Sequence, residues 1–228
     1  MIGGGWMLFR EAWLMRGFGT ATLLTMVVFA MACGGDSGRA DAELEYDRAA
    51  ELLAQGSIRK AGAAYNVALR LDPDYAEAYV GRSRVFLAFD NTASAVADLD
   101  RAISLDPGLA MAYSYRGVAH MTSGDTGSAM LDLTKAIEVD PFLVDAHVFR
   151  ARLSARDDNI ESAILDMGSA ISLRPLSDVL YMERAQMYLA TGDVGGAIAD
   201  LEEVLSLSQD ETALDQARRL LAQLGAGG

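Results

Sequence analysis

The sequence is poor in the residues that most enzymes and metalloproteins use for chemistry. It contains one cysteine, Cys33, and two histidines, His120 and His147. A single cysteine excludes an internal disulfide framework, and two histidines are too few for a multi-ligand zinc pattern. No serine or cysteine nucleophile is accompanied by a plausible base, and no phosphate-binding loop occurs. We therefore predict that the protein is not an enzyme, and that it holds no metal and no cofactor.

Basic residues are also scarce. The chain has 19 lysines and arginines against 32 aspartates and glutamates, which gives a formal net charge of -13 at pH 7. Nucleic-acid binding requires a basic face that contacts phosphates, so this balance argues against a nucleic-acid-binding protein. The 51% hydrophobic content is nevertheless sufficient for a core.

The N-terminal region has the pattern of an export signal. An uncharged, mostly apolar run covers residues 19–32 after Arg16. It is shorter than the ~20 residues of a membrane-spanning helix, and small residues end it, as signal cleavage requires. The tetrapeptide from Ala30 to Cys33 resembles the lipobox of bacterial lipoproteins, although leucine is usual where Ala30 stands. This resemblance implies a signal peptide over residues 1–32, with Met15 as an alternative start, and a lipidated Cys33. An ordinary secretory leader and an uncleaved anchor remain alternatives.

Residues 33–41 are small, polar and rich in glycine, which predicts a flexible tether. In the lipoproteins that the leader resembles, the residue after the cysteine influences sorting, and Gly34 favours the outer membrane. We therefore expect a lipid-anchored protein of the bacterial cell envelope, on the periplasmic side of the outer membrane if the organism has one. Anchoring at the inner membrane is the alternative.

The few prolines reveal an internal repeat. The sequence has four prolines, each 34 residues from the next. They are Pro73, Pro107, Pro141 and Pro175. Columns of small and apolar residues follow the same period, as in paired helices that pack closely. The main columns are Ala61, Ala95, Ala129, Ala163 and Ala197; Ala49, Ser83, Gly117, Ala151 and Ala185; and the larger Tyr65, Leu99, Leu133, Met167 and Leu201.

Residues that tolerate a left-handed backbone mark the turn inside each unit. They are Gly56, Asp90, Gly124, Asp158 and Gly192. A period of 34 with two helices per unit is the pattern of the tetratricopeptide repeat (TPR), and at these residues the chain resembles that family. The units cover residues 42–75, 76–109, 110–143, 144–177 and 178–211. The last unit has Gln209 in place of proline, and the first has Glu45 in its aromatic position. Residues 212–224 resemble the capping helix that shields the last unit.

The resemblance implies an all-α, right-handed superhelical solenoid of five TPR repeats with a C-terminal capping helix. Opposite charges recur in the same frame, which predicts structural ion pairs between the two helices of a unit. An arginine ladder for an anionic ligand is the alternative interpretation. The arginines are Arg82, Arg116, Arg150 and Arg184, and the aspartates are Asp98, Asp132, Asp166 and Asp200. The two histidines occupy columns of packing residues.

In TPR proteins the first helices line a concave groove that receives a peptide. Mapping their outward columns onto this sequence predicts an apolar groove that carries three arginines. Aromatic, methionine and arginine side chains dominate binding energy at interfaces. The predicted groove consists of Tyr46, Val80, Arg84, Met111, Tyr115, Val148, Phe149, Arg152, Arg156 and Met182. The Lys/Asn set with which chaperone-binding TPR domains hold a C-terminal carboxylate is missing.

The sequence therefore predicts a non-catalytic scaffold that binds a protein or peptide partner and no small-molecule substrate. With the leader, the prediction becomes an adaptor or assembly factor tethered to a membrane through its lipid anchor. A recruiting subunit of an envelope hydrolase or protease, and a signal-anchored protein that faces the cytoplasm, are the alternatives.

Overall fold

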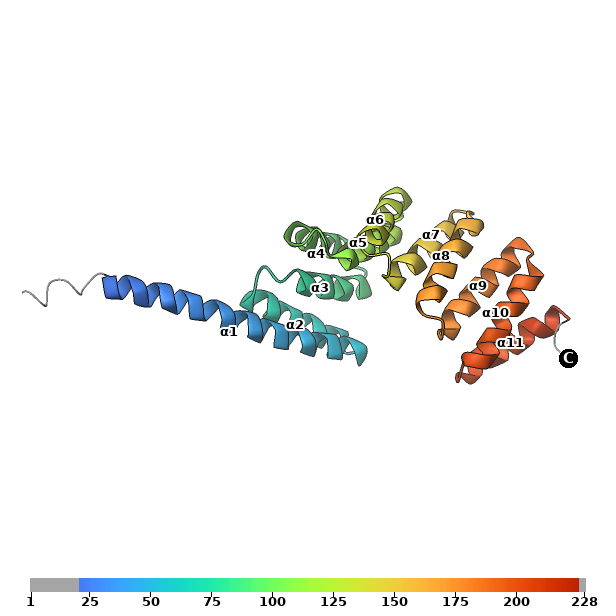
Figure 1. The fold of residues 1–228 in the computed structure, drawn as a ribbon, viewed down its shortest axis with the longest axis horizontal. Coiled ribbons are helices and arrows are strands. Elements are labelled where there is room, and N and C mark those ends of the chain that lie inside the picture. Colours follow the sequence, from blue (N-terminus) through green and yellow to red (C-terminus); the bar gives the residue numbers. More distant parts are fainter. Residues whose placement is uncertain (1–20, 226–228) are drawn as a thin grey trace, which may run out of the picture.

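The structure is a row of paired helices (Figure 1). The computed structural model describes the backbone of residues 21–225 and the side chains of residues 38–225. Within residues 21–225 it contains eleven helices and no strand. The helices are α1 (Ala21–Ala54), α2 (Ile58–Leu71), α3 (Ala76–Ala88), α4 (Thr92–Leu105), α5 (Ala110–Ser123), α6 (Thr126–Val139), α7 (Val144–Arg156), α8 (Ile160–Leu173), α9 (Asp178–Thr191), α10 (Val194–Leu207) and α11 (Glu211–Gln223).

Each odd-numbered helix from α1 to α9 packs mainly against the even-numbered helix that follows it, and α11 packs on α10. The pairs follow one another along the long axis of the molecule, so the result is an open solenoid (Figure 1). This arrangement confirms the predicted all-α solenoid of five helix pairs and a final helix.

The turn inside each pair has the left-handed residue that the sequence predicts. Asp90 and Asp158 have φ values of 57° and 58°. Gly56, Gly124 and Gly192 occupy the equivalent positions, with φ values between 72° and 82°. The second helix of a pair then begins with a side-chain cap, because Asn91, for example, accepts a hydrogen bond from the backbone N–H of Ser94.

The turn between pairs is set by an aspartate and a proline. After α2, Asp72 adopts an extended backbone with φ -134° and ψ 97°, as expected for a residue before proline. Its carboxylate accepts a hydrogen bond from the backbone N–H of Asp74 at 3.0 Å. The Tyr79 hydroxyl of the next helix donates to the carbonyl of Pro73 at 3.1 Å, which fixes the start of α3 on this turn.

The core lies between the helices of each pair, where the small-residue columns allow close approach. The alanine column from Ala61 to Ala197 is fully buried. Two glycines of the first helices are in tight contact: a Cβ at Gly81 would lie 2.3 Å from the Tyr65 ring, and one at Gly117 would lie 2.8 Å from Leu133 Cγ. The separation of the helices is therefore set by the smallest residues in the frame.

The first helix differs from the expected tether. Residues 33–41 were expected to be flexible, but α1 is helical from Ala21 to Ala54 and includes them. The Arg39 guanidinium donates a hydrogen bond to Asp72 at 2.5 Å and lies 3.9 Å from the centroid of the Tyr75 ring. These contacts attach residues 38–41 to the turn after α2, so tertiary contact outweighs the flexible composition of the segment.

The predicted export signal cannot be placed in this structure. Residues 1–20 lie outside the described residues, and so do the side chains of residues 21–37, including the thiol of Cys33. Among the helices of residues 21–225, none combines the length and the apolar character that crossing a membrane requires.

Candidate partner-binding surface

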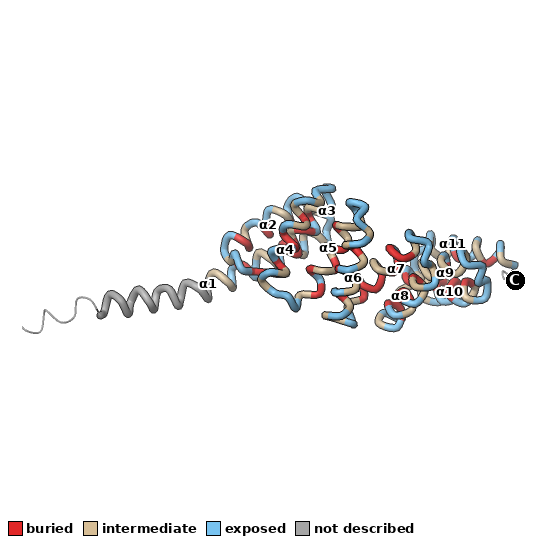
Figure 2. The backbone as a smooth tube through the Cα atoms, turned by 90° about the horizontal axis from the view of Figure 1, so that it is seen from above, coloured by how far each residue is buried: buried red, intermediate tan, exposed pale blue. Residues whose placement is uncertain are grey.

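The odd-numbered helices form the inner side of the solenoid. Along the stack α1 contacts α3, α3 contacts α5, and α5 contacts α7, whereas no two even-numbered helices of the described chain make comparable contact. A stack whose first helices lie closer together than its second helices curves towards the first helices. The concave surface is therefore formed by α1, α3, α5, α7 and α9. Buried positions alternate with exposed ones along these helices (Figure 2).

Three residues of the predicted groove do not belong to its surface. Val80, Val148 and Met182 are buried, with 3%, 7% and 9% of their surface exposed. They pack in the core clusters between successive repeats, Val80 for example with Leu99 and Ala112. The curvature of the stack presses this column of the first helices onto the next repeat. The prediction that they meet a partner is therefore wrong for these three residues.

The other seven predicted residues are wholly or partly accessible. Their side chains lie on the first helices of all five pairs except the last. They are Tyr46, Arg84, Met111, Tyr115, Phe149, Arg152 and Arg156. Tyr115 and Phe149 approach each other from α5 and α7, with their ring centroids 6.3 Å apart. An aromatic contact thus occupies the middle of the concave surface.

Arg152 is already paired inside the protein. It donates two hydrogen bonds to Glu183 of α9, at 2.9 and 2.5 Å, and these bonds raise the pKa of Arg152. The expected groove with three available arginines therefore has only Arg84 and Arg156 without an ion pair among residues 38–225. The sequence analysis missed Glu183. The spacing of 31 residues between Arg152 and Glu183, which equals that between Arg84 and Tyr115, could have revealed it.

Next to this ion pair lies a hollow of about 400 Å³ between α7 and α9. Its apolar lining comes from Ala155, Ile160, Met187 and Ala190, and polar side chains stand around it. The first helices of the two repeats are farther apart here than along the rest of the stack, since α7 and α9 lack the contact that the preceding pairs make. A hollow of this size can receive a large apolar side chain.

The recurring arginines and aspartates meet inside each repeat. Arg82, Arg116, Arg150 and Arg184 each donate two hydrogen bonds, through Nε and Nη2, to the aspartate 16 residues ahead. All eight bonds measure 2.7 or 2.8 Å. The aspartates are buried and the arginines lie against the second helix, away from the groove. The hydrogen bonds to the aspartates raise the pKa of each arginine.

Three of these arginines also bind the preceding repeat through Nη1. Arg82 donates to Asn66 at 2.8 Å, and Arg116 donates to Asp100 at 2.6 Å. Arg150 makes a longer contact of 3.4 Å with the Thr134 hydroxyl. The position equivalent to Asn66, Asp100 and Thr134 in the next repeat is a glycine. The arginines thus connect successive repeats as well as the helices within one repeat, which favours the structural interpretation over a ligand ladder.

The two histidines replace aromatic residues beside this ladder. His147 occupies a tyrosine column, and its Nε2 lies 3.0 Å from the Pro141 carbonyl, as the Tyr79 hydroxyl does at Pro73. A carbonyl only accepts hydrogen bonds, so Nε2 carries the proton. His120 lies 3.7 Å from Asp132. The histidines take part in packing and local hydrogen bonding at the ladder, not in a metal site: among the described residues, no three His, Cys, Asp or Glu side chains are placed to hold a metal ion.

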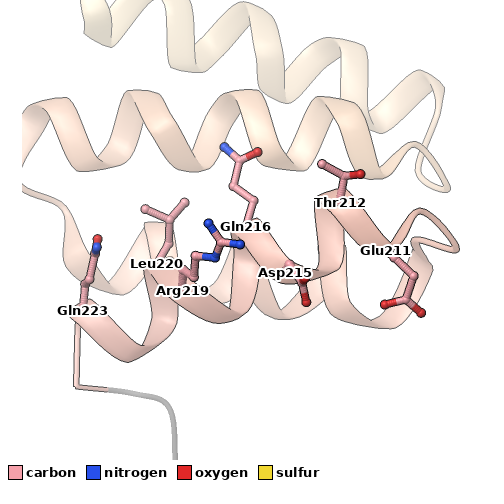
Figure 3. Close-up of a pocket in the computed structure, with 7 residues that line it drawn as sticks. All are labelled: Glu211, Thr212, Asp215, Gln216, Arg219, Leu220 and Gln223. Carbon is pink, nitrogen blue, oxygen red and sulfur yellow. The ribbon is translucent and has the colours of Figure 1, made fainter.

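The largest hollow lies on the last helix and is not a chemical site. Its volume is about 530 Å³, and all seven lining residues belong to α11 (Figure 3). Six of them are polar or charged, and the seventh is Leu220. The buried face of the same helix, with Ala217 and Leu221, packs on the preceding pair. A polar outer face on a terminal helix is the arrangement that closes a solenoid to solvent.

Comparison with protein families agrees with this geometry. Models of the tetratricopeptide repeat match residues 46–110 and residues 179–211. The chain therefore carries tetratricopeptide repeats, and the fold and the concave surface are those of a TPR solenoid. Comparison with curated proteins gave no match.

Solved structures show the same fold at low sequence identity. PilF of Pseudomonas aeruginosa is 17% identical with a TM-score of 0.71, over 85% of this chain and 87% of that one. PilW, described as a type IV pilus biogenesis factor, is 19% identical with a TM-score of 0.69, over 81% of this chain and 86% of that one. YrrB, described as a TPR protein with an unusual peptide-binding site, is 18% identical with a TM-score of 0.54, over 78% of this chain and 92% of that one.

Proposed function

We propose that this protein is a non-catalytic interaction scaffold that binds a peptide segment of a partner protein along its concave surface. The observation that carries the proposal is the 400 Å³ apolar hollow between α7 and α9, which continues the aromatic contact between Tyr115 and Phe149. Apolar hollows flanked by arginine and aromatic side chains are typical of binding surfaces. The two neighbours described as a pilus biogenesis factor and a peptide-binding protein support the same class of function.

We further propose that the scaffold acts in the bacterial envelope as an adaptor or assembly factor, attached to a membrane by a lipid on Cys33. The support is the apolar run at residues 19–32 with its lipobox-like end. Two or more acyl chains hold a protein on a membrane stably, whereas one chain binds only marginally. Service to an envelope hydrolase or protease, and a cytoplasm-facing protein with an uncleaved anchor, are the competing forms of the same proposal.

Site-specific crosslinking tests the binding surface. A photoreactive amino acid is placed at Arg156, which lies beside the hollow, and in a matched control at Leu165, which is 74% exposed on the second helix α8. We expect a protein partner to be captured in cells from position 156 and not from position 165. Equal capture at both positions, or capture of a small molecule alone, would contradict the scaffold. Identification of a hydrolase or protease as the partner would select the recruiting form.

Metabolic labelling tests the anchor. Cells that express the wild type or the Cys33→Ala variant are fed an alkyne-bearing fatty acid, and the protein is examined for label after purification. We expect label on the wild type only. An unlabelled wild type would exclude lipidation, and an intact N-terminus found by mass spectrometry would indicate the uncleaved anchor.

A further inference from the structure

The concave surface has a second, smaller cavity at its N-terminal end. Its volume is about 60 Å³, and it lies where α1, α2, α3 and the start of α5 meet. Two tyrosines and Arg84 line it together with Glu77 and apolar residues. The full lining is Tyr46, Ala50, Tyr65, Glu77, Val80, Gly81, Arg84, Leu109 and Met111. This cavity differs from the apolar hollow at α7 and α9 because hydrogen-bond donors converge on it.

Arg84 is the cation of this cavity, and its N–H groups have no carboxylate partner. Among residues 38–225 it forms no ion pair, and its guanidinium carbon lies 5.3 Å from the centroid of the Tyr115 ring. Arg152, which occupies the same position two repeats later, is held by Glu183 at the spacing where Arg84 meets Tyr115. The protein therefore neutralises one of these two groove arginines and leaves the other available.

Three phenol groups surround Arg84. The Tyr46 and Tyr65 ring centroids lie 5.8 Å apart, and the Tyr65 ring ends against the backbone of Gly81, one turn before Arg84. Burial raises the pKa of Tyr65 to about 12, and the positive charge of Arg84 acts in the opposite direction. Tyr46 and Tyr115 show the same two effects, so all three phenolic oxygens lie within the field of one guanidinium. The phenols stay protonated at neutral pH and can donate hydrogen bonds.

The size and charge of the cavity select among anions. A volume of about 60 Å³ is comparable to two water molecules in the liquid, which at ~30 Å³ each suits a carboxylate group. Glu77 lines the same cavity without an ion pair to Arg84. A doubly charged phosphate would be repelled by Glu77 more than a singly charged carboxylate would be.

We propose that Arg84, with the hydroxyl groups of Tyr46, Tyr65 and Tyr115, binds the side-chain carboxylate of an aspartate or glutamate in the partner peptide. The inference rests on the proposed peptide-binding function and adds a chemical requirement to it. Charge complementarity carries it: the one groove arginine ringed by phenols lacks an acid of its own. In a chain of net charge -13, such a site confers selectivity for peptides whose acid lies at one position.

A peptide library tests the proposal on the full chain. Decapeptides of random sequence with amidated C-termini are selected for binding, and the affinity of the selected peptides is measured by fluorescence anisotropy. We expect the selected peptides to be enriched in aspartate or glutamate at one position. Arg84→Gln should weaken their binding about ten- to a hundredfold, the range of hydrogen bonds to a charged group. The matched control Arg101→Gln, at an exposed ion pair with Asp74, should leave binding unchanged.

Changing the acid of the peptide to its amide completes the test. This peptide should lose affinity for the wild type by the same factor and should lose nothing further on Arg84→Gln. Tyr115→Phe, which keeps the ring and removes the hydroxyl, should weaken the acidic peptide and not the amide peptide.

Four outcomes would overturn the assignment. Peptides that bind with no acidic enrichment would refute the carboxylate site and leave the scaffold function intact. Binding that requires a free C-terminus would assign Arg84 to a terminal carboxylate instead. Preference for phosphorylated peptides would assign it to phosphate. Failure to select any peptide would count against the proposed function itself.

Discussion

Replacing Arg116 by methionine should destabilise the solenoid because it leaves a buried carboxylate without its partner. Arg116 donates two hydrogen bonds of 2.8 Å to Asp132, which is only 8% exposed. It donates a third, of 2.6 Å, to Asp100, whose side chain is 56% exposed. Methionine keeps the length and helix propensity of the side chain, so the substitution mainly tests the charge.

The buried partner decides the magnitude. Removing one member of a buried ion pair costs about 3–5 kcal/mol, whereas an exposed pair such as that with Asp100 is worth less than about 1 kcal/mol. The His120 ring lies 3.7 Å from the Asp132 carboxylate and compensates part of the loss. We therefore expect a loss of about 3 kcal/mol in the free energy of unfolding. In a chain of this size that lowers the melting temperature by about 6–12 °C.

Far-UV circular dichroism during thermal and urea unfolding measures this loss. Arg101→Met is the matched control, since its ion pair with Asp74 is exposed, and it should change stability by less than about 1 kcal/mol. The double variant Arg116→Met, Asp132→Leu should recover most of the stability, because apolar residues often replace a buried ion pair without loss. The reasoning is refuted if Arg116→Met costs no more than the control, or if the double variant is as unstable as the single one. Peptide binding below the melting temperature should be unchanged, which separates the ladder from a ligand site.

Three further substitutions test the packing frame. Gly81→Ala places a Cβ 2.3 Å from the Tyr65 ring and should cost at least the 1–3 kcal/mol of an overpacked core, whereas an unchanged urea midpoint would show that the two helices can separate. Gly168→Ala meets only a guanidinium nitrogen at 3.5 Å and should raise the free energy of unfolding by about 0.5–1 kcal/mol through helix propensity; a lower value would reveal strain in that helix. His147→Tyr should keep the hydrogen bond to the Pro141 carbonyl and remove an unpaired buried ring nitrogen, so we expect unchanged or slightly higher stability in the same assay, and a loss above about 1 kcal/mol would contradict the packing role.

Features that recur in every repeat could be predicted from the sequence. The left-handed turn position occurs five times as glycine or aspartate, and each of the five has positive φ in the structure. The arginine and the aspartate 16 residues ahead occur together four times, and all four pairs are in contact. Repetition makes such positions readable, because one chain supplies several examples of the same local environment.

Features that depend on the stacking of one repeat on the next could not be predicted in this way. The burial of Val80, Val148 and Met182 follows from the curvature of the stack, which no single repeat contains. The pairing of Arg152 with Glu183 joins two repeats and occurs once. The helical state of residues 38–41 depends on Asp72 and Tyr75, which lie more than thirty positions away in the sequence. In each case the missing information is a contact between repeats.

Two arginines that are neighbours in the sequence show how one helix separates architecture from recognition. Arg82 and Arg84 are two positions apart on α3, and an α-helix turns about 100° per residue, so their side chains leave the helix about 200° apart. Arg82 faces α4 and binds Asp98, whereas Arg84 faces the concave surface and lies on Tyr115. Arg150 and Arg152 repeat this arrangement on α7. Loss of the first arginine of each pair should therefore lower stability, while loss of Arg84 should alter binding alone. Because the ladder is the same in four repeats and the groove partners differ, the groove can vary its specificity without changing the frame that holds it.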